Sequence, residues 1–286
     1  MRRKSKKMTK KNNILKQAAA YPHIVWAVLF IIAPLLFVAY YAFTNTNEDG
    51  KVFFTFKNIL SLATPEYLEV FLRSVCFAFL ATVICFVIAY PVAYFISRTS
   101  PKVQKILVML IMLPQWLNFL IRTYSWMAIL EDTGIINSIL ELVGLELHMI
   151  NTPGAVILGM VYNFLPYMII PIHTAMTKID PRVLEAASDL GCSPLRVVLK
   201  VVFPLSLSGV ISGITMVFVP SISTFYISQK LGGGNFDLIG DSIERQFQTQ
   251  YDYNMGAAMS FVLMLLIIVS MAVMNKYSDD EGGVIV

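Results

Sequence analysis

The segment IDPRVLEAASDLGCSPLRVVLKVVFP, Ile179 to Pro204, decides the fold, because it sets a short polar stretch between two long apolar runs. Asp180-Pro181 is a helix-start signal, since a carboxylate caps free N–H groups and proline lacks one. Gly191 suits the left-handed position that follows a helix. The segment therefore predicts a short polar helix that begins near Asp180 and ends before Gly191.

A second helix is expected directly after the first. Ser193-Pro194 repeats the start signal, and Pro204 should break or kink the helix where the next apolar run begins. The sequence thus predicts a helix–turn–helix at a membrane surface. A helix resting on lipid headgroups would share these signals, although the apolar face here is narrow and has no aromatic anchor.

The composition predicts an all-α integral membrane protein. Apolar residues make up 57% of the 286 residues and charged residues only 14%, whereas soluble domains are about 45–50% apolar. A membrane-spanning helix needs about 20 apolar residues. Six windows meet that length, at residues 24–43, 75–96, 106–130, 154–176, 205–228 and 256–275.

The basic residues predict the orientation. Sixteen Lys and Arg fall in the N-terminal arm, two alternate loops and the tail, against five in the other loops. The positive-inside rule then places both termini in the cytoplasm. We expect a basic cytoplasmic arm at 1–23, a transmembrane domain at 24–275 with a cytoplasmic loop at 177–204, and a cytoplasmic tail at 276–286. The arm is an orientation signal near anionic lipid, with no need of nucleic acid.

Chemistry on this chain is not expected. No phosphate-binding G-x-x-x-x-G-K-[ST] motif occurs, and the three histidines have no partners at metal-ligand spacing, so the sequence predicts no catalytic residue and no metal site. No Asp or Glu falls in the centre of a span. Proton- and sodium-coupled carriers commonly need such carboxylates, so energy for transport should come from another subunit.

The polar segment resembles the EAA loop of ABC importer permeases of the MetI-like family. That pattern is E-A-A, three residues, G, nine residues, I-x-L-P, and every spacing is matched by Glu185-Ala186-Ala187, Gly191 and Val201-Val202-Phe203-Pro204. In the family the first helix of this loop is a coupling helix that docks on an ATPase subunit. The resemblance therefore implies a coupling site of Glu185, Ala186, Ala187, Gly191 and Pro204, to which Arg182 and Asp189 could add ion pairs.

Other segments are similar to spermidine/putrescine permeases within this family, in particular the first of their two membrane subunits. They are FTFKNILSL (54–62), LPQWLNFLIRTYSW (113–126), VYNFLPYMIIPI (161–172) and FYISQKLGGGNFDLIGDSIERQF (225–247). The resemblance implies a multi-pass protein of the bacterial cytoplasmic membrane. Its expected partners are two ATPase copies that hold the ATP and magnesium, a second homologous permease and an extracytoplasmic substrate-binding protein. No cofactor is expected on the chain itself.

Polar and aromatic side chains within spans are candidates for a translocation path, because in hydrocarbon they must face a cavity or a partner. For any single Ser or Tyr, a helix–helix hydrogen bond explains its presence equally well. Arg122 is awkward for a cation path, and its expected position in the outer third of a span suggests a gate. The candidates are Gln115, Trp116, Asn118, Arg122, Tyr124, Tyr162, Asn163, Tyr167, Ser221, Ser223, Thr224 and Tyr226.

The resemblance implies that the chain takes part in uptake of a polyamine by an ATP-driven importer, and this is the predicted function. Eight acidic residues in the outer loops 131–153 and 229–255, Asp241 among them, would form an acidic mouth that attracts cations, although the usual charge asymmetry of a membrane protein would explain them equally well. Three alternatives stay open: the same mechanism with another cation, sulfate or molybdate as cargo; a stand-alone secondary carrier; and a scaffold protein without a substrate path.

Overall fold

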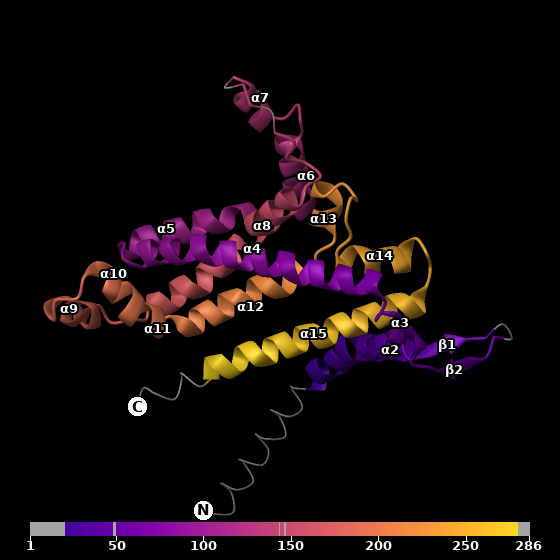
Figure 1. The fold of residues 1–286 in the computed structure, drawn as a ribbon. Helices are drawn as coiled ribbons and strands as arrows, with labels where there is room; N and C mark the ends of the chain where they lie inside the picture. The colour runs from indigo at the N-terminus through magenta and orange to yellow at the C-terminus, as the bar shows by residue number, and fades with distance from the viewer. Residues whose placement is uncertain (1–20, 48–49, 143, 146, 280–286) are drawn as a thin grey trace, which may run out of the picture.

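The computed structural model describes residues 21–47, 50–142, 144–145 and 147–279, and almost all regular structure in them is helical (Figure 1). Most of the predicted N-terminal arm and the end of the predicted tail lie outside these residues. Within the described residues, four helices are long and apolar enough to cross a membrane alone: Tyr21–Ala42, Pro65–Ser97, Pro153–Met176 and Tyr253–Met274. If each of two bent helix pairs counts as one span, the number of candidate spans is six, the number predicted.

The first span ends in α2 (Ala33–Ala42), which packs against α15 (Tyr253–Asp279). A π-helical turn at Val28–Ile32 comes directly before Pro34 in sequence, because a proline has no N–H to close the normal helical hydrogen bond. After α2 follow the hairpin strands β1 (Thr44–Thr46) and β2 (Val52–Phe54), antiparallel with Thr44 opposite Phe54, and then α3 (Lys57–Ser61). Asn58 of α3 donates to the carbonyls of Ala42 and Thr44, which fixes the hairpin to the span.

The core of the bundle is formed by α4 (Pro65–Ser97), α8 (Pro153–Met176) and α12 (Leu207–Ser223). Small residues line the buried face of α4 at intervals of four, namely Ala81, Cys85, Ala89 and Ala93. On α12, Gly209 and Gly213 lie so close to α8 that an added Cβ would come within 2.6 Å and 2.7 Å of its atoms. Such small-residue contacts allow membrane helices to pack backbone to backbone.

The predicted third span, 106–130, is not one straight helix. It consists of α5 (Pro101–Met112), a 3₁₀ turn at Leu113–Trp116, and α6 (Phe119–Leu130), which continues toward α7 (Ile135–Glu141) at 88° to the first part. The break follows Pro114, and Asn118 restarts the helix by accepting the N–H of Leu120 at 2.8 Å. In Figure 1, α6 and α7 point away from the bundle, toward the top of the view.

The predicted fifth span, 205–228, is also interrupted, at both ends. The polar loop contains α9 (Pro181–Asp189), α10 (Pro194–Val197), a π-helical turn at Val198–Val202 and α11 (Phe203–Leu205), and residues 194–205 meet α12 at 71°. Beyond α12 the backbone is extended at Thr224, and α13 (Tyr226–Leu231) and α14 (Ile239–Gln248) follow. Figure 1 shows α13 and α14 at one end of the bundle and α9–α11 at the other.

Candidate functional site

The predicted coupling helix is present as α9, with the predicted caps. Asp180 Oδ1 accepts the N–H of Arg182 at 2.9 Å, and Gly191 adopts the left-handed conformation at φ +79°. The N–H of Gly191 donates to the Ser188 carbonyl, and the N–H of Cys192 donates to the Ala187 carbonyl. This pair of bonds is a Schellman motif, which satisfies the last carbonyls of the helix and turns the chain sharply.

The two faces of α9 have different environments. Arg182, Glu185, Ala186 and Asp189 are exposed, and within the described residues no ion pair includes Glu185. Ala187, in contrast, is half-buried and packs with Leu184 against the bundle core. The outward face is therefore free for a partner, while Ala187 and Leu184 join α9 to the transmembrane helices.

Exposed leucines at the same end of the molecule were missed by the motif-based prediction. Leu190 is 86% exposed at the end of α9, and Leu195 and Leu199 are exposed on the following helix. An apolar side chain that no internal contact requires is a docking candidate. The exposure of Leu190 could have been predicted from the sequence, because Leu190 directly precedes a helix-ending glycine.

Pro204 acts as predicted, with the bend slightly displaced. The π-helical turn at Val198–Val202 comes just before it, as at Pro34, and the 71° bend falls at Ser206. Ser206 is fully buried, and its hydroxyl lies 3.3 Å from the hydroxyl of Tyr90 on α4. The loop thus joins α12 through a defined bend that α4 supports.

Four of the predicted path residues form one hydrogen-bonded network. Gln115 Oε1 accepts from Arg122 Nη1 at 3.1 Å and from the Tyr167 hydroxyl at 3.5 Å. Gln115 Nε2 donates to the Asn163 carbonyl at 2.8 Å. Because Gln115 precedes the break in the third span and Arg122 follows it, the network holds the 88° bend against α8.

Arg122 does not occupy the expected place along a straight span, because α6 runs nearly perpendicular to α5. Its side chain is only 7% exposed, lies over the ring of Phe119, and has one nitrogen, Nε, with no hydrogen-bond partner among the described residues. Among those residues it pairs with no acid in the outer loops. A structural role in the bend thus accounts for Arg122 at least as well as a gate.

An aromatic group joins α6 to α13. Tyr226 contacts Tyr124 edge to face and also packs against Phe119, and the Lys230 ammonium lies 5.5 Å and 5.7 Å from the centres of the two tyrosine rings. Further along α6, Trp126 packs edge to face on Tyr162 of α8. These rings form a surface suited to cation contact, although Lys230 already supplies one cation.

The remaining predicted path residues do not share one site. Trp116 is 74% exposed at the break in the third span, beside the helix cap Asn118. Ser223 donates to the Val219 carbonyl within its own helix, while Ser221 and Thr224 are buried. Gly240 of α14 packs closely against the backbone of Ser223 and Thr224. A Cβ added to Gly240 would lie 2.7 Å from the carbonyl oxygen of either residue.

One acidic residue of the expected acidic mouth, Asp241, is buried. Asp241 is 5% exposed, and its Oδ2 accepts the N–H of Leu238 at 2.8 Å while Oδ1 has no hydrogen-bond partner among the described residues. Burial raises the pKa of the Asp241 carboxyl to about 6. Asp237 of the same loop is paired with Arg245. The outer surface is therefore less acidic than the sequence suggested.

The chain is similar to known membrane transport proteins. The family model described as the binding-protein-dependent transport system inner membrane component matches residues 86–279. The spermidine/putrescine transport system permease protein PotB of Escherichia coli K12 is 37% identical over 246 residues, covering 84% of this chain and 90% of that protein. The protein of the same name from Haemophilus influenzae is 36% identical, covering 85% and 88%.

Solved structures give the same fold. A chain of a bacterial ABC transporter involved in the import of the acidic polysaccharide alginate superposes with a TM-score of 0.79 at 16% identity, covering 94% of this chain and 96% of that one. A chain of the MetNI methionine ABC transporter gives 0.54 at 17% identity, covering 75% and 95%. At such identities the likeness concerns the fold alone.

Proposed function

Because the chain belongs to the family of binding-protein-dependent transport system inner membrane components, we propose that it is the permease subunit of an ATP-driven importer of polyamines such as spermidine and putrescine. It is a multi-pass protein of the bacterial inner membrane and a transport component, not an enzyme. Membership in the family implies an ATPase and a substrate-binding protein as partners. The proposal adds two ATPase copies, holding ATP and magnesium, and a second homologous permease.

The observation that carries the polyamine assignment is the identity of 37% over 84% of the chain to a spermidine/putrescine permease. The chemistry within the spans is compatible with it. The Gln115 network offers amide, hydroxyl and carbonyl oxygens, and Tyr124 and Tyr226 offer aromatic faces, all of which attract ammonium groups. With no carboxylate in a span centre, binding along this path would be weak, as rapid release requires.

We propose that α9 transmits the ATPase movement to the spans. Its outward face carries Arg182, Glu185 and Asp189, which would meet a groove on the ATPase through charge-assisted contacts. Its inward face, at Ala187, packs on the bundle, and the Schellman motif fixes its end. A displacement of α9 would therefore move α8 and α12 rather than be lost in a flexible loop.

The coupling role is tested by Glu185→Lys in the complete transporter. A reversed charge in a docked, hydrogen-bonded contact costs about 1.5–3 kcal/mol or more, so ATP-driven uptake should fall at least about tenfold. Glu66→Lys, the same exchange at an exposed residue in the first turn of α4, is the control and should retain uptake. Normal uptake by Glu185→Lys at equal membrane levels would disprove the coupling role.

The cargo is tested by uptake of labelled spermidine and putrescine into proteoliposomes that contain the complete transporter and its binding protein. ATP-dependent uptake, competed by unlabelled polyamine and not by sulfate or molybdate, is the expected result. Uptake without any ATPase would instead indicate a secondary carrier. Uptake of an oxyanion would keep the importer mechanism and replace the cargo.

A further inference from the structure

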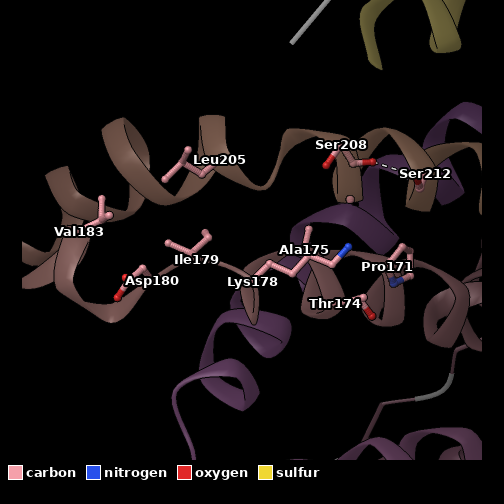
Figure 2. Close-up of a pocket in the computed structure, with 11 residues that line it drawn as sticks. Pro171, Thr174, Ala175, Lys178, Ile179, Asp180, Val183, Leu205, Ser208 and Ser212 are labelled. Atoms are coloured by element: carbon pink, nitrogen blue, oxygen red, sulfur yellow. Dashed lines mark hydrogen bonds between the residues drawn. The ribbon is translucent and has the colours of Figure 1, made fainter. Parts of the chain in front are cut away.

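A cavity of about 530 Å³ opens between α8, α12 and the start of α9, at the end of the bundle that carries the coupling loop. Figure 2 shows its walls, with Thr174 and Lys178 on one side, Ser208 and Ser212 on the other, and Asp180 and Val183 of the coupling loop at its end. Of these, only Lys178 and Asp180 carry charge. None of the predicted path residues lies in the cavity.

One face of α8 leads from the network described above to the wall of the cavity. Tyr167, Pro171 and Thr174 are spaced at i, i+4 and i+7 on α8, so they share one face of the helix, and Lys178 lies in the turn that follows α8. At the end of this row nearer the Gln115 network, Tyr167 donates to Gln115. At the end nearer the cavity, Thr174 and Lys178 are exposed. The row therefore runs from the Gln115 network to the cavity.

The α12 wall has a matching row. Ser208 and Ser212 are exposed, while Gly209 and Gly213, one position on, are buried against α8. The close contact made by the glycines sets the two serines along the edge of the α8–α12 seam, facing the same side as Thr174 (Figure 2). The ends of the row are apolar, at Leu205 and Met216.

The hydroxyls in these rows are able to accept hydrogen bonds. Thr174 donates its proton to the Ile170 carbonyl at 2.8 Å, and Ser212 donates to the Ser208 carbonyl at 2.8 Å. With the proton directed at the helix, the oxygen lone pairs remain free for an ammonium donor. The hydroxyl rows contain no carboxylate, and the one acid in the cavity wall, Asp180, accepts the N–H of Arg182, so the wall would bind an ammonium weakly and let it move on.

The face that carries these rows differs from a lipid-facing one. Along α4, in contrast, large apolar side chains are exposed, for example Leu72, Phe79, Val87 and Phe95. Membrane proteins direct polar side chains toward water-filled cavities or partner helices rather than hydrocarbon. The hydroxyl rows and Lys178 thus indicate that this side of α8 and α12 is wet.

We propose that this cavity is the vestibule through which the cationic substrate leaves toward the cytoplasm, with Thr174, Ser208 and Ser212 as its acceptor wall. This inference rests on the proposed function. The side chain of Lys178 runs along the cavity (Figure 2), and its fixed positive charge repels an ammonium group, which favours release and opposes re-entry. Because Val183 and Asp180 of the coupling loop form part of the wall, movement of α9 changes the shape of the vestibule directly.

The test is thiol labelling of Ser212→Cys in the complete transporter in inside-out vesicles, with Cys76 and Cys192 replaced by alanine. A charged, membrane-impermeant methanethiosulfonate should modify Ser212→Cys at least about tenfold faster than Val87→Cys on the exposed apolar face of α4, and spermidine should slow that reaction. In Lys178→Gln vesicles, half-protection should occur at a several-fold lower spermidine concentration, because the repelling charge is absent.

Labelling of Ser212→Cys as slow as that of Val87→Cys would overturn the inference, because the face would then be in lipid. Rapid labelling that spermidine leaves unchanged, in a transporter that does take up spermidine, would also overturn it. If the transporter does not take up polyamines, the cargo proposal fails by itself, and rapid labelling of Ser212→Cys still supports a vestibule at this place.

Discussion

Asp241→Asn should stabilise the protein above pH 6 and have little effect near pH 4. The carboxyl is buried at the start of α14, with the N–H of Leu238 as its hydrogen-bond donor and the acids Asp237 and Glu244 nearby. Desolvation disfavours the charged form, so the folded-state pKa of Asp241 is raised from 3.8 to about 6. Asparagine keeps an oxygen for Leu238 and removes the charge.

The direction of the stability change with pH follows from proton binding to Asp241. Between pH 3.8 and about 6 the folded protein keeps a proton on Asp241 that the unfolded chain releases, so stability falls as the pH rises through this window. A shift of about two pKa units at about 1.4 kcal/mol each gives a loss of roughly 3 kcal/mol, complete by about pH 7. The Asp241→Asn protein avoids this loss.

The measurement is the thermal midpoint of the purified protein in detergent at several pH values between 4 and 8. The difference between Asp241→Asn and the unaltered protein should be near zero at pH 4 and reach several degrees at pH 8. Asp252→Asn, the same exchange at an exposed helix cap with no burial cost, is the control. If the Asp241→Asn protein is less stable at pH 8 than the unaltered protein, the reasoning is refuted, because the ionised carboxylate must then be paired.

Two further predictions concern the membrane helices. Gly209→Ala places a Cβ 2.6 Å from the Ala175 Cβ and the Pro171 carbonyl oxygen, so it should destabilise the protein by about 1–3 kcal/mol. The measurement is a lower thermal midpoint. The control is Gly154→Ala, whose added Cβ meets nothing closer than 3.6 Å and should leave the thermal midpoint unchanged. Arg122→Ala removes the donor that holds Gln115 across the bend and should reduce both uptake and substrate-stimulated ATP hydrolysis in the complete transporter; unchanged values would exclude both a structural and a gating role.

The local helix signals were predictable because each depends on a few neighbouring residues. Asp180-Pro181 and Gly191 begin and end α9 as expected, since capping and left-handed backbone are properties of those side chains themselves. The number of apolar segments was likewise readable, because bilayer thickness sets a minimum helix length.

The bends and the buried polar contacts were not predictable, because they depend on residues far apart in the chain. Pro114 permits a break but does not set its 88° angle, which the contacts of Gln115 with Asn163 and Tyr167 hold. Asp241 looks like any acid of an outer loop until α14 folds over the end of α12. The serines of the vestibule were overlooked because a lone serine in an apolar helix commonly serves only its own backbone.

The break in the third span also affects the lipid around the protein. From Pro101 to Trp116 the helix reaches only about 25 Å at ~1.5–2 Å per residue, short of the ~30 Å hydrocarbon core, before α6 turns away at 88°. Beside α5 the bilayer must thin, or neighbouring protein must fill the missing depth. Hydrophobic mismatch of this kind costs fractions of a kcal/mol per Å, so the energy of the bilayer beside α5 depends on the acyl-chain length of the lipid.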